Sequence, residues 1–413
     1  MHKEDPGWPT VGGNPRSPAF GEYDVSTGAI SHRTITNTHH DMFCPGISQL
    51  EDGRIIISGG SGAEVTSIYD PVTNNFTRGP DLKLPRGYQT TCTLSTGEVF
   101  TIGGAYSGNR VAKNGEVYDP ITNTWTYLPG ADVSPIVTTN SGGYEGDHAW
   151  LFGWKNGSIF QAGPSKNQHW YSIAGSGSVS MAGTRDTDDA MCGIWVMYDA
   201  VAAGGSPLYT NSDANQRTHI TTINEPGAPS VLVTGGQRKS LIFKDTDSIL
   251  VAELFNPITK QWKQMASMTV PPNYHSISIL LPDATVFADT TVDHSDGEIF
   301  EPPYLFNADG SYAARPTVSA LSTGPFKAGA RLTFTVEGVV GLAQVSLIRT
   351  GSVTHSVNSD QRRVPLDNVE INGKEYSPRL PNDYGILTPG YYYLFVTTPQ
   401  GTPSIAKTVH IIL

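Results

Sequence analysis

Four short segments combine thiol, phenol and imidazole side chains with residues that bend the chain. Such side chains bind metals and transfer protons. If the fold brings them together, they form a site that could hold a metal ion. The segments are His40–Gly46 with Cys44 ahead of Pro-Gly, Arg86–Gln89 with Tyr88, Pro271–Ser276 with Tyr274 and His275, and Thr354–Asn358 with His355.

Each segment also has a purely structural interpretation. An isolated cysteine such as Cys44 is most often a small buried hydrophobic residue, and Tyr88 can be an aromatic at the edge of a core with its hydroxyl satisfied. Tyr274 and His275 are adjacent, so on a regular strand they would point to opposite faces. They can share one site only where the strand begins irregularly, which the preceding Pro-Pro pair favours. Each segment alone is therefore a weak signal.

A repeat indicates the elements that must position these residues. Its unit is a Gly-Gly pair, then an aromatic-Asp/Asn-Pro-x-Thr turn, then a large aromatic five residues after the proline. A spacing of about 50 residues is typical of Kelch propeller blades of four strands. We expect Glu98–Ile102 to be a buried strand and each final aromatic to pack between blades. The clear copies end at Phe76, Trp125 and Trp262, and a weaker copy is Tyr23–Gly28.

The repeat stops near Arg315-Pro316, and alternating apolar and polar residues follow. This alternation predicts the antiparallel strands of an immunoglobulin-like sandwich. The sequence thus predicts an all-β protein with a Kelch-type propeller at 1–312 and a sandwich at 313–413. An all-β protein with recurrent hairpins is the structural alternative. The predicted sandwich strands are Arg331–Val336, Gln344–Arg349 and Tyr391–Val396.

Composition and charge exclude several classes of protein. The 413 residues include 44 glycines and 29 prolines, which suits short strands with many turns. The net charge is −11 with no basic patch, so we expect no nucleic-acid partner. No apolar run has the length of a membrane span, and residues 1–20 lack the apolar core of a signal peptide, as expected for a mature or clipped form. The three cysteines are too scattered for a disulfide framework.

Taken together and in this order, the segments resemble the galactose oxidase family of copper radical oxidases. The resemblance extends from about Tyr23 to the end of the chain. It implies a seven-bladed propeller, incomplete here, and oxidation of primary alcohols by O₂. The segments that carry it are His40–Ser48, Arg86–Gln89, Asn114–Tyr118, His148–Gly163, Ala190–Ala200, Tyr274–Pro282 and Thr354–Arg363.

The resemblance implies one copper ion with His275 and His355 as imidazole ligands. Tyr88 would be an equatorial phenolate, joined through its ring to the sulfur of Cys44, and Tyr274 would be the axial phenolate. Two imidazoles and two phenolates in a tetragonal arrangement favour Cu(II). A free tyrosine has a pKa of about 10, so coordination is what would keep Tyr88 a phenolate at neutral pH.

The same resemblance implies a radical mechanism with a protein-derived cofactor. Alcohol oxidation removes two electrons and Cu(II) accepts one, so the cross-linked Tyr88 ring would accept the other. Tyr274 would take the alcohol proton, and O₂ would leave as H₂O₂. Tyr106 takes the position at which the family stacks a tryptophan on the thioether. No nicotinamide or flavin is expected.

The substrate contacts depart from the family pattern. Tyr144, Tyr209 and Phe243 match substrate-binding positions, but the arginine that follows the first tyrosine is replaced by Glu145 and a glutamine beside the second by Thr210. Losing a bidentate guanidinium weakens the recognition of sugar hydroxyls. We therefore predict a weaker preference for galactose, with aryl or aliphatic primary alcohols, or larger galactosides, as alternative substrates.

The chain also lacks pieces that the family carries. The family's N-terminal carbohydrate-binding domain and the start of the first blade are missing, and roughly 20 residues, about two strands, are missing between Ile223–Gly227 and Val233–Gly236. Closure of the propeller is therefore in question. The alternatives to a secreted, monomeric alcohol oxidase are a glyoxal-oxidase-like enzyme acting on aldehydes, a non-catalytic Kelch binding scaffold, and an inactive fragment.

Overall fold

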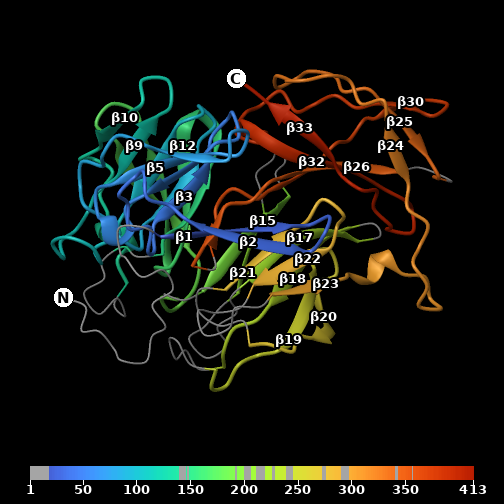
Figure 1. The fold of residues 1–413 in the computed structure, drawn as a ribbon, viewed down its shortest axis with the longest axis horizontal. Helices are drawn as coiled ribbons and strands as arrows, with labels where there is room; N and C mark the ends of the chain where they lie inside the picture. The colour runs from blue at the N-terminus through green and yellow to red at the C-terminus, as the bar shows by residue number, and fades with distance from the viewer. Residues whose placement is uncertain are drawn as a thin grey trace.

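The chain is built from β-strands and short turns (Figure 1). Within the described residues there is no α-helix, which confirms the all-β prediction, and thus no helix that could cross a membrane. The computed structural model describes residues 18–138, 146, 148–190, 193–199, 206–210, 219–225, 228–238, 245–271, 276–289, 297–339, 343–355 and 357–413.

Strands β1 to β23 form successive small antiparallel sheets, as in the blades of a propeller. The four-stranded sheets are β3 (Gly46–Gln49), β4 (Ile55–Ser58), β5 (Thr66–Asp70) and β6 (Asn75–Arg78); β7 (Thr90–Thr93), β8 (Val99–Ile102), β9 (Glu116–Asp119) and β10 (Thr124–Tyr127); β11 (Trp150–Gly153), β12 (Ser158–Gly163), β13 (Asn167–Ser172) and β14 (Ser178–Thr184); and β17 (His219–Glu225), β18 (Ala228–Thr234), β19 (Val251–Asn256) and β20 (Gln261–Ser267). The smaller sheets are β21 (Ile277–Leu280), β22 (Val286–Asp289) and β23 (Gly297–Phe300); β1 (Ala19–Asp24) and β2 (Ala29–Thr34); and β15 (Ile194–Asp199) and β16 (Ser206–Thr210). Short 3-10 turns are η1 (Gly60–Gly62), η2 (Ser134–Ile136), η3 (Lys155–Gly157) and η4 (Pro303–Leu305).

The repeated turns form as predicted because their hydrogen bonds are local. The carboxylate of Asp70 accepts the Val72 N–H at 2.9 Å, and that of Asp119 accepts the Ile121 N–H at 2.8 Å. In the third copy the Asn256 amide oxygen accepts the Ile258 N–H at 2.9 Å. Such side-chain bonds fix a turn without help from the rest of the fold. The predicted strand at Val99–Ile102 is likewise buried along its whole length.

The innermost strands of neighbouring sheets contact one another, with β3 against β7, β7 against β11, and β17 against both β15 and β21. The glycine pairs Gly59-Gly60 and Gly103-Gly104 follow the second strands of two of these sheets, β4 and β8, where the chain passes close to neighbouring backbone. Gly103 has φ +75°, and a Cβ there would lie 2.0 Å from the carbonyl oxygen of Gly146. Gly60 has φ +86°, and its Cβ would lie 2.4 Å from the Phe43 oxygen. Side chains larger than hydrogen are excluded from both positions.

The ribbon β1–β2 bridges the first four-stranded sheet and the last sheet. Phe20 of β1 packs against Phe76 with ring centroids 5.0 Å apart, and Tyr23 stacks on Phe287 of β22 at 4.9 Å. Among the described strands the ribbon makes no ladder with either neighbour, and β2 is exposed throughout. Side-chain packing rather than strand pairing therefore joins the two ends of this part of the chain.

One predicted aromatic contact is wrong. Phe76 and Trp125 are buried as expected, and the Trp125 indole N–H donates to Thr66 Oγ1 of the preceding sheet at 3.2 Å. Trp262, in contrast, is 45% exposed and packs only against Phe255 of its own sheet among the described ring contacts. The physical reason is that β20 is the edge strand of its sheet and is exposed over most of its length, so the indole meets solvent there.

The segment expected to lack two strands folds as a single hairpin. β17 pairs with β18 from His219↔Thr234 to Glu225↔Ala228, and β18 pairs with β19 in turn. β17 is therefore the inner strand of a four-stranded sheet that it forms with β18, β19 and β20.

The C-terminal strands form two facing sheets and a separate hairpin, in orange to red in Figure 1. The predicted strand Gln344–Arg349 occurs with those bounds, and the other two are shifted at their ends. The sheets are β24 (Thr317–Ser319), β25 (Phe334–Glu337), β31 (Glu375–Ser377) and β30 (Glu370–Asn372); and β29 (Arg363–Pro365), β26 (Gln344–Arg349), β32 (Gly390–Thr397) and β33 (Lys407–Ile411); the hairpin is β27 (Val353–Thr354) with β28 (Val357–Asn358).

The hairpin β27–β28 leaves the sandwich and enters the centre of the propeller part. β27 contacts β3 and β21, and β28 contacts β15. These three strands belong to three different sheets, and β15 and β21 are the first strands of theirs. A segment that touches all three lies on the axis around which the sheets are arranged.

Candidate active site

Cys44 and Tyr88 are held next to each other by their backbones. The Tyr88 N–H donates to the Cys44 carbonyl at 3.0 Å. Cys44 lies two residues before β3 and Tyr88 two residues before β7, and both side chains are buried. Their φ angles are +57° and +66°, a conformation that residues other than glycine rarely adopt. Strained backbone of this kind is concentrated at functional sites.

Three further rings surround the Tyr88 ring. The ring centroid of Tyr106 lies 4.5 Å away, that of His355 at 4.8 Å and that of His148 at 5.3 Å. The two imidazoles are themselves 4.9 Å apart. Tyr106 meets Tyr88 at an interplanar angle of 61°, so the contact is edge-on rather than a parallel stack. A phenol and two imidazoles thus meet at the end of the inner strands.

His355 stands at the tip of the β27–β28 hairpin. It is buried, with φ +52°. Its Nδ1 lies 2.6 Å from Thr354 Oγ1, and its Nε2 is also buried. Since Nδ1 is engaged by the threonine, a metal bound by this ring would be bound through Nε2. A hydrogen bond to the second ring nitrogen is the usual way to orient a metal-binding histidine.

A buried ion pair anchors the loop that carries Tyr88. The Arg86 guanidinium donates to the carbonyls of Gly103 (2.8 Å) and Asn114, and pairs with Glu116 at 2.9 Å. Glu116 also accepts the Lys83 N–H at 2.7 Å. Both charges are fully buried; burial lowers the pKa of Arg86, and Glu116 opposes that effect. Such a pair is stable only while both partners are present.

The structure brings together Cys44, Tyr88, Tyr106 and His355 of the predicted site residues. Tyr209 lies on β16, but its side chain is outside the described part of the chain. Four predicted residues lie outside the described residues altogether: Tyr274, His275, Tyr144 and Phe243.

His148 was not predicted as a site residue. Its N–H donates to the Tyr88 carbonyl at 3.0 Å, its φ is +53°, and its side chain is buried. The segment His148–Gly163 contributes to the family resemblance, but a single histidine before a buried strand carries no signal of its own. Its backbone hydrogen bond to Tyr88 and its ring contacts with Tyr88 and His355 reveal its place.

The described residues fit a copper ion. Of the predicted ligands, the buried Tyr88 phenol and the buried His355 imidazole are in ring contact, and they are oxygen and nitrogen donors of the kind that Cu(II) prefers. The buried Cys44 belongs to the backbone segment that is hydrogen-bonded to Tyr88. His355, which is predicted as a ligand, lies beside strands of the propeller part because the β27–β28 hairpin contacts β3, β15 and β21.

Comparisons with known proteins agree with this arrangement. Residues 315–411 match the model described as galactose oxidase-like, early set domain, and residues 86–130 match the Kelch motif, in the predicted order of propeller and sandwich. A galactose oxidase of Gibberella zeae is 43% identical over 94% of this chain, which spans only 63% of that protein.

Two other relatives cover most of the chain. A solved structure described as a novel fungal alcohol oxidase with catalytic diversity among the AA5 family, in complex with copper, is similar with a TM-score of 0.89 and 38% identity, over 98% of this chain and 92% of that one. An aldehyde oxidase of Arabidopsis thaliana is 22% identical over 94% of this chain and 74% of that protein.

Proposed function

Because the chain belongs to the galactose oxidase family, we propose that it is a copper radical oxidase that converts a primary alcohol and O₂ into an aldehyde and H₂O₂. The observation that carries the proposal is the convergence of Cys44, Tyr88 and His355 from three separate segments. Folding alone requires neither the positive φ angles at these residues nor their burial beside one another.

The site residues would divide the chemistry between them. Copper, when bound by Tyr88, Tyr274, His275 and His355, would supply the acceptor for one of the two electrons. A bond between Cys44 Sγ and a ring carbon of Tyr88, formed with loss of two hydrogen atoms to O₂, would make that ring easier to oxidise and so able to accept the second electron. Tyr274 would accept the alcohol proton.

Two more side chains support the Tyr88 ring. Tyr106 meets it edge-on and would shield the oxidised ring from solvent. His148 meets it at an interplanar angle of 83° and also contacts His355, so it would hold the phenol and the imidazole at a fixed separation.

The substrate class follows from the changed sugar contacts. Tyr144, Tyr209 and Phe243 keep the apolar and aromatic part of the family's pocket, while Glu145 and Thr210 replace two hydrogen-bonding partners of the sugar. We therefore propose aryl or aliphatic primary alcohols as substrates at least as good as galactose. Turnover of galactose and of benzyl alcohol at equal concentration tests this, and a strong preference for galactose would contradict it.

The same proposal covers the organisation and location of the protein. Residues 1–312 would form the catalytic propeller, and 313–413 the sandwich that lends His355 to it. The enzyme would act outside the cell as a monomer of 44.3 kDa on small molecules, without a nucleic-acid or membrane partner. Sedimentation of the copper-loaded protein measures the state of association directly.

Oxygen uptake with copper-loaded protein tests the activity. We expect one H₂O₂ for each O₂ consumed with benzyl alcohol, and loss of at least 10²-fold in turnover for Cys44→Ser. Cys92→Ser is the matched control, because Cys92 is the other buried cysteine among the described residues and packs in the hydrophobic cluster with Leu94 and Phe100. Oxidation of aldehydes but not alcohols would favour the glyoxal-oxidase-like alternative, and absence of copper binding would favour the binding scaffold.

A further inference from the structure

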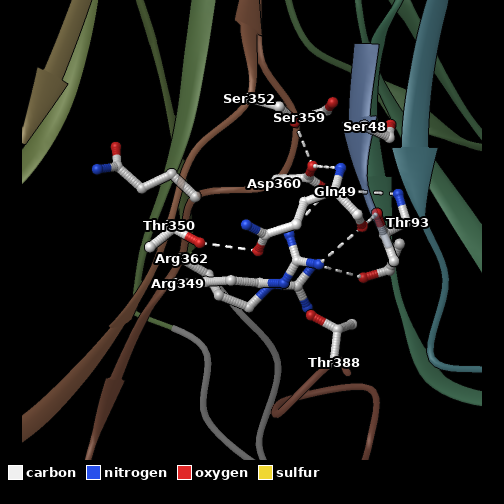
Figure 2. Close-up of polar contacts among 12 residues, drawn as sticks. Ser48, Gln49, Thr93, Arg349, Thr350, Ser352, Ser359, Asp360, Arg362 and Thr388 are labelled. Carbon is white, nitrogen blue, oxygen red and sulfur yellow. Dashed lines mark hydrogen bonds and ion pairs between the residues drawn. The ribbon is translucent and has the colours of Figure 1, made fainter. Parts of the chain in front are cut away.

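The base of the His355 hairpin is closed by a buried carboxylate (Figure 2). Asp360 is 1% exposed and follows β28 by two residues. The Ser352 hydroxyl, immediately before β27, donates to Asp360 Oδ2. The two ends of the segment that carries His355 are therefore tied to each other through this carboxylate.

The same carboxylate binds two strands of the propeller part. Its Oδ2 accepts the Gln49 N–H at 3.0 Å, and its Oδ1 accepts the Thr93 N–H at 3.4 Å (Figure 2). Gln49 is the last residue of β3, and Thr93 is the last residue of β7. The other ends of these strands follow Cys44 and Tyr88, respectively.

One side chain thus connects the three segments that carry the candidate site. Each strand has four residues, so each runs about 10–13 Å from the carboxylate towards the site. Short strands of this kind are stiff because they are paired along their length with β4 and β8. A shift at Asp360 would therefore move Cys44, Tyr88 and His355 relative to one another.

The negative charge of Asp360 is paired with the positive charge of a buried arginine. Arg349 of β26 is fully buried and pairs with Asp360 Oδ1 at 3.0 Å, while its guanidinium also donates to the carbonyls of Gln49 (3.3 Å) and Pro389 (2.9 Å). Ser359 strengthens the contact by donating to the Thr91 carbonyl at 2.5 Å. A buried ion pair with further hydrogen bonds fixes geometry more than it adds stability.

We propose that Asp360 is a positioning residue for the copper site: it sets the separation between the Cys44–Tyr88 pair and His355. This inference rests on the proposed function, because His355 is a copper ligand only there. Asp360 touches neither substrate nor copper in this account. Its effect is transmitted through Ser352 and the N–H groups at the ends of β3 and β7.

The test compares Asp360→Asn and Ser352→Ala with wild type and with Asp383→Asn. Asp383 is the matched control, since it also joins the sandwich to a propeller cation, Lys155, at 2.8 Å but lies outside the hairpin. The full chain is loaded with Cu(II) in air, and the rate of Cys44–Tyr88 cross-linking is followed by peptide mass. Amide hydrogen exchange of residues 350–358 is measured on the copper-free chain.

We expect Asp360→Asn and Ser352→Ala to cross-link at least tenfold more slowly than wild type and to exchange at least tenfold faster in residues 350–358. Asp383→Asn should match wild type in both measurements. If Asp360→Asn does not fold, the double variant Arg349→Met/Asp360→Leu removes the charges together, a replacement that buried ion pairs often tolerate. It should fold and show the same two losses.

The outcomes separate this proposal from the one it rests on. Suppose that wild type forms the cross-link and that every folded variant matches it in cross-linking rate and in hydrogen exchange. This result would overturn the role of Asp360 but not the proposed function. If wild type itself binds no copper and forms no cross-link, the proposed function fails, and the exchange of residues 350–358 still decides whether Asp360 positions the hairpin.

Discussion

His40 should make the stability of this protein depend on pH between about 4 and 6.5. The side chain is fully buried beneath the turn that precedes η1. Its Nε2 lies 2.7 Å from the Gly59 carbonyl, which can only accept, so Nε2 carries a hydrogen, and its Nδ1 lies 2.9 Å from Ser67 Oγ. Both ring nitrogens therefore have a hydrogen-bond partner when the imidazole is neutral. The pKa of His40 is lowered to about 4, mainly by burial; the Gly59 hydrogen bond opposes this effect, and the charges of Arg78 and Asp81 act in opposite directions.

The sign and size of this pH effect on stability follow from the difference in proton binding between the folded and the unfolded chain. Between pH 6.5 and pH 4 the unfolded chain binds a proton at His40 that the folded chain does not bind. The free energy of unfolding therefore falls as the pH falls. A pKa of 6.5 in the unfolded chain and about 4 in the folded chain corresponds to about 3 kcal/mol lost between pH 7 and pH 4. Above pH 7 the ring is neutral in both states, and the contribution is constant.

Urea unfolding of wild type and His40→Gln at pH 4, 5, 6 and 7 measures this contribution. The advantage of wild type over the variant should shrink by about 3 kcal/mol from pH 7 to pH 4, because glutamine can make both hydrogen bonds but does not titrate. Replacing the exposed His32 by glutamine is the control and should leave the pH profile unchanged. A difference between wild type and His40→Gln that stays the same at every pH would refute the reasoning.

Further predictions concern buried charge and the repeat aromatics. Glu116→Gln leaves the buried Arg86 without its counter-charge and should lower the free energy of unfolding by about 3–5 kcal/mol in urea titrations; the exposed Glu337→Gln is the control and should not move the midpoint. An unchanged midpoint for Glu116→Gln would show that the carbonyls around Arg86 suffice. Trp125→Ala should lower the free energy of unfolding by about 3–5 kcal/mol, whereas Trp262→Ala should lower it by about 1 kcal/mol or less because Trp262 is 45% exposed. If the two variants lost the same stability in thermal melts, Trp262 would have to be covered in solution.

The parts of the fold that were predicted correctly depend on neighbouring residues in the chain. The turns at Asp70, Asp119 and Asn256 close through hydrogen bonds to the next residues, so their sequence suffices. The exposure of Trp262 was not predictable in this way. It depends on how distant segments pack around β20, which is exposed over most of its length.

The candidate site was predictable only in part. Cys44, Tyr88, Tyr106 and His355 were identified through the family resemblance, and the ring contacts among the last three are what the structure adds. His148 carries no recognisable pattern. Its role depends on one backbone hydrogen bond to a residue sixty positions away.

Asp360 illustrates the same limit for buried charge. In the sequence it stands among polar residues beside two arginines and reads as a solvated acid. In the structure it is enclosed by two propeller strands and the sandwich. Burial of this kind arises from the docking of distant segments, which local sequence does not record.

The most direct test of the central claim is the covalent state of Cys44 and Tyr88. The protein is loaded with Cu(II) in air, reduced with thiol and digested with trypsin, which releases the peptides Thr34–Arg54 and Gly87–Arg110. The account predicts one joined species, lighter than the sum of the peptides by two hydrogen atoms and resistant to thiol. Thiol resistance distinguishes it from a disulfide to Cys92, which lies in the second peptide. Two separate peptides would contradict the account, because the proposed copper site would then not form the cross-link on which the proposed function depends.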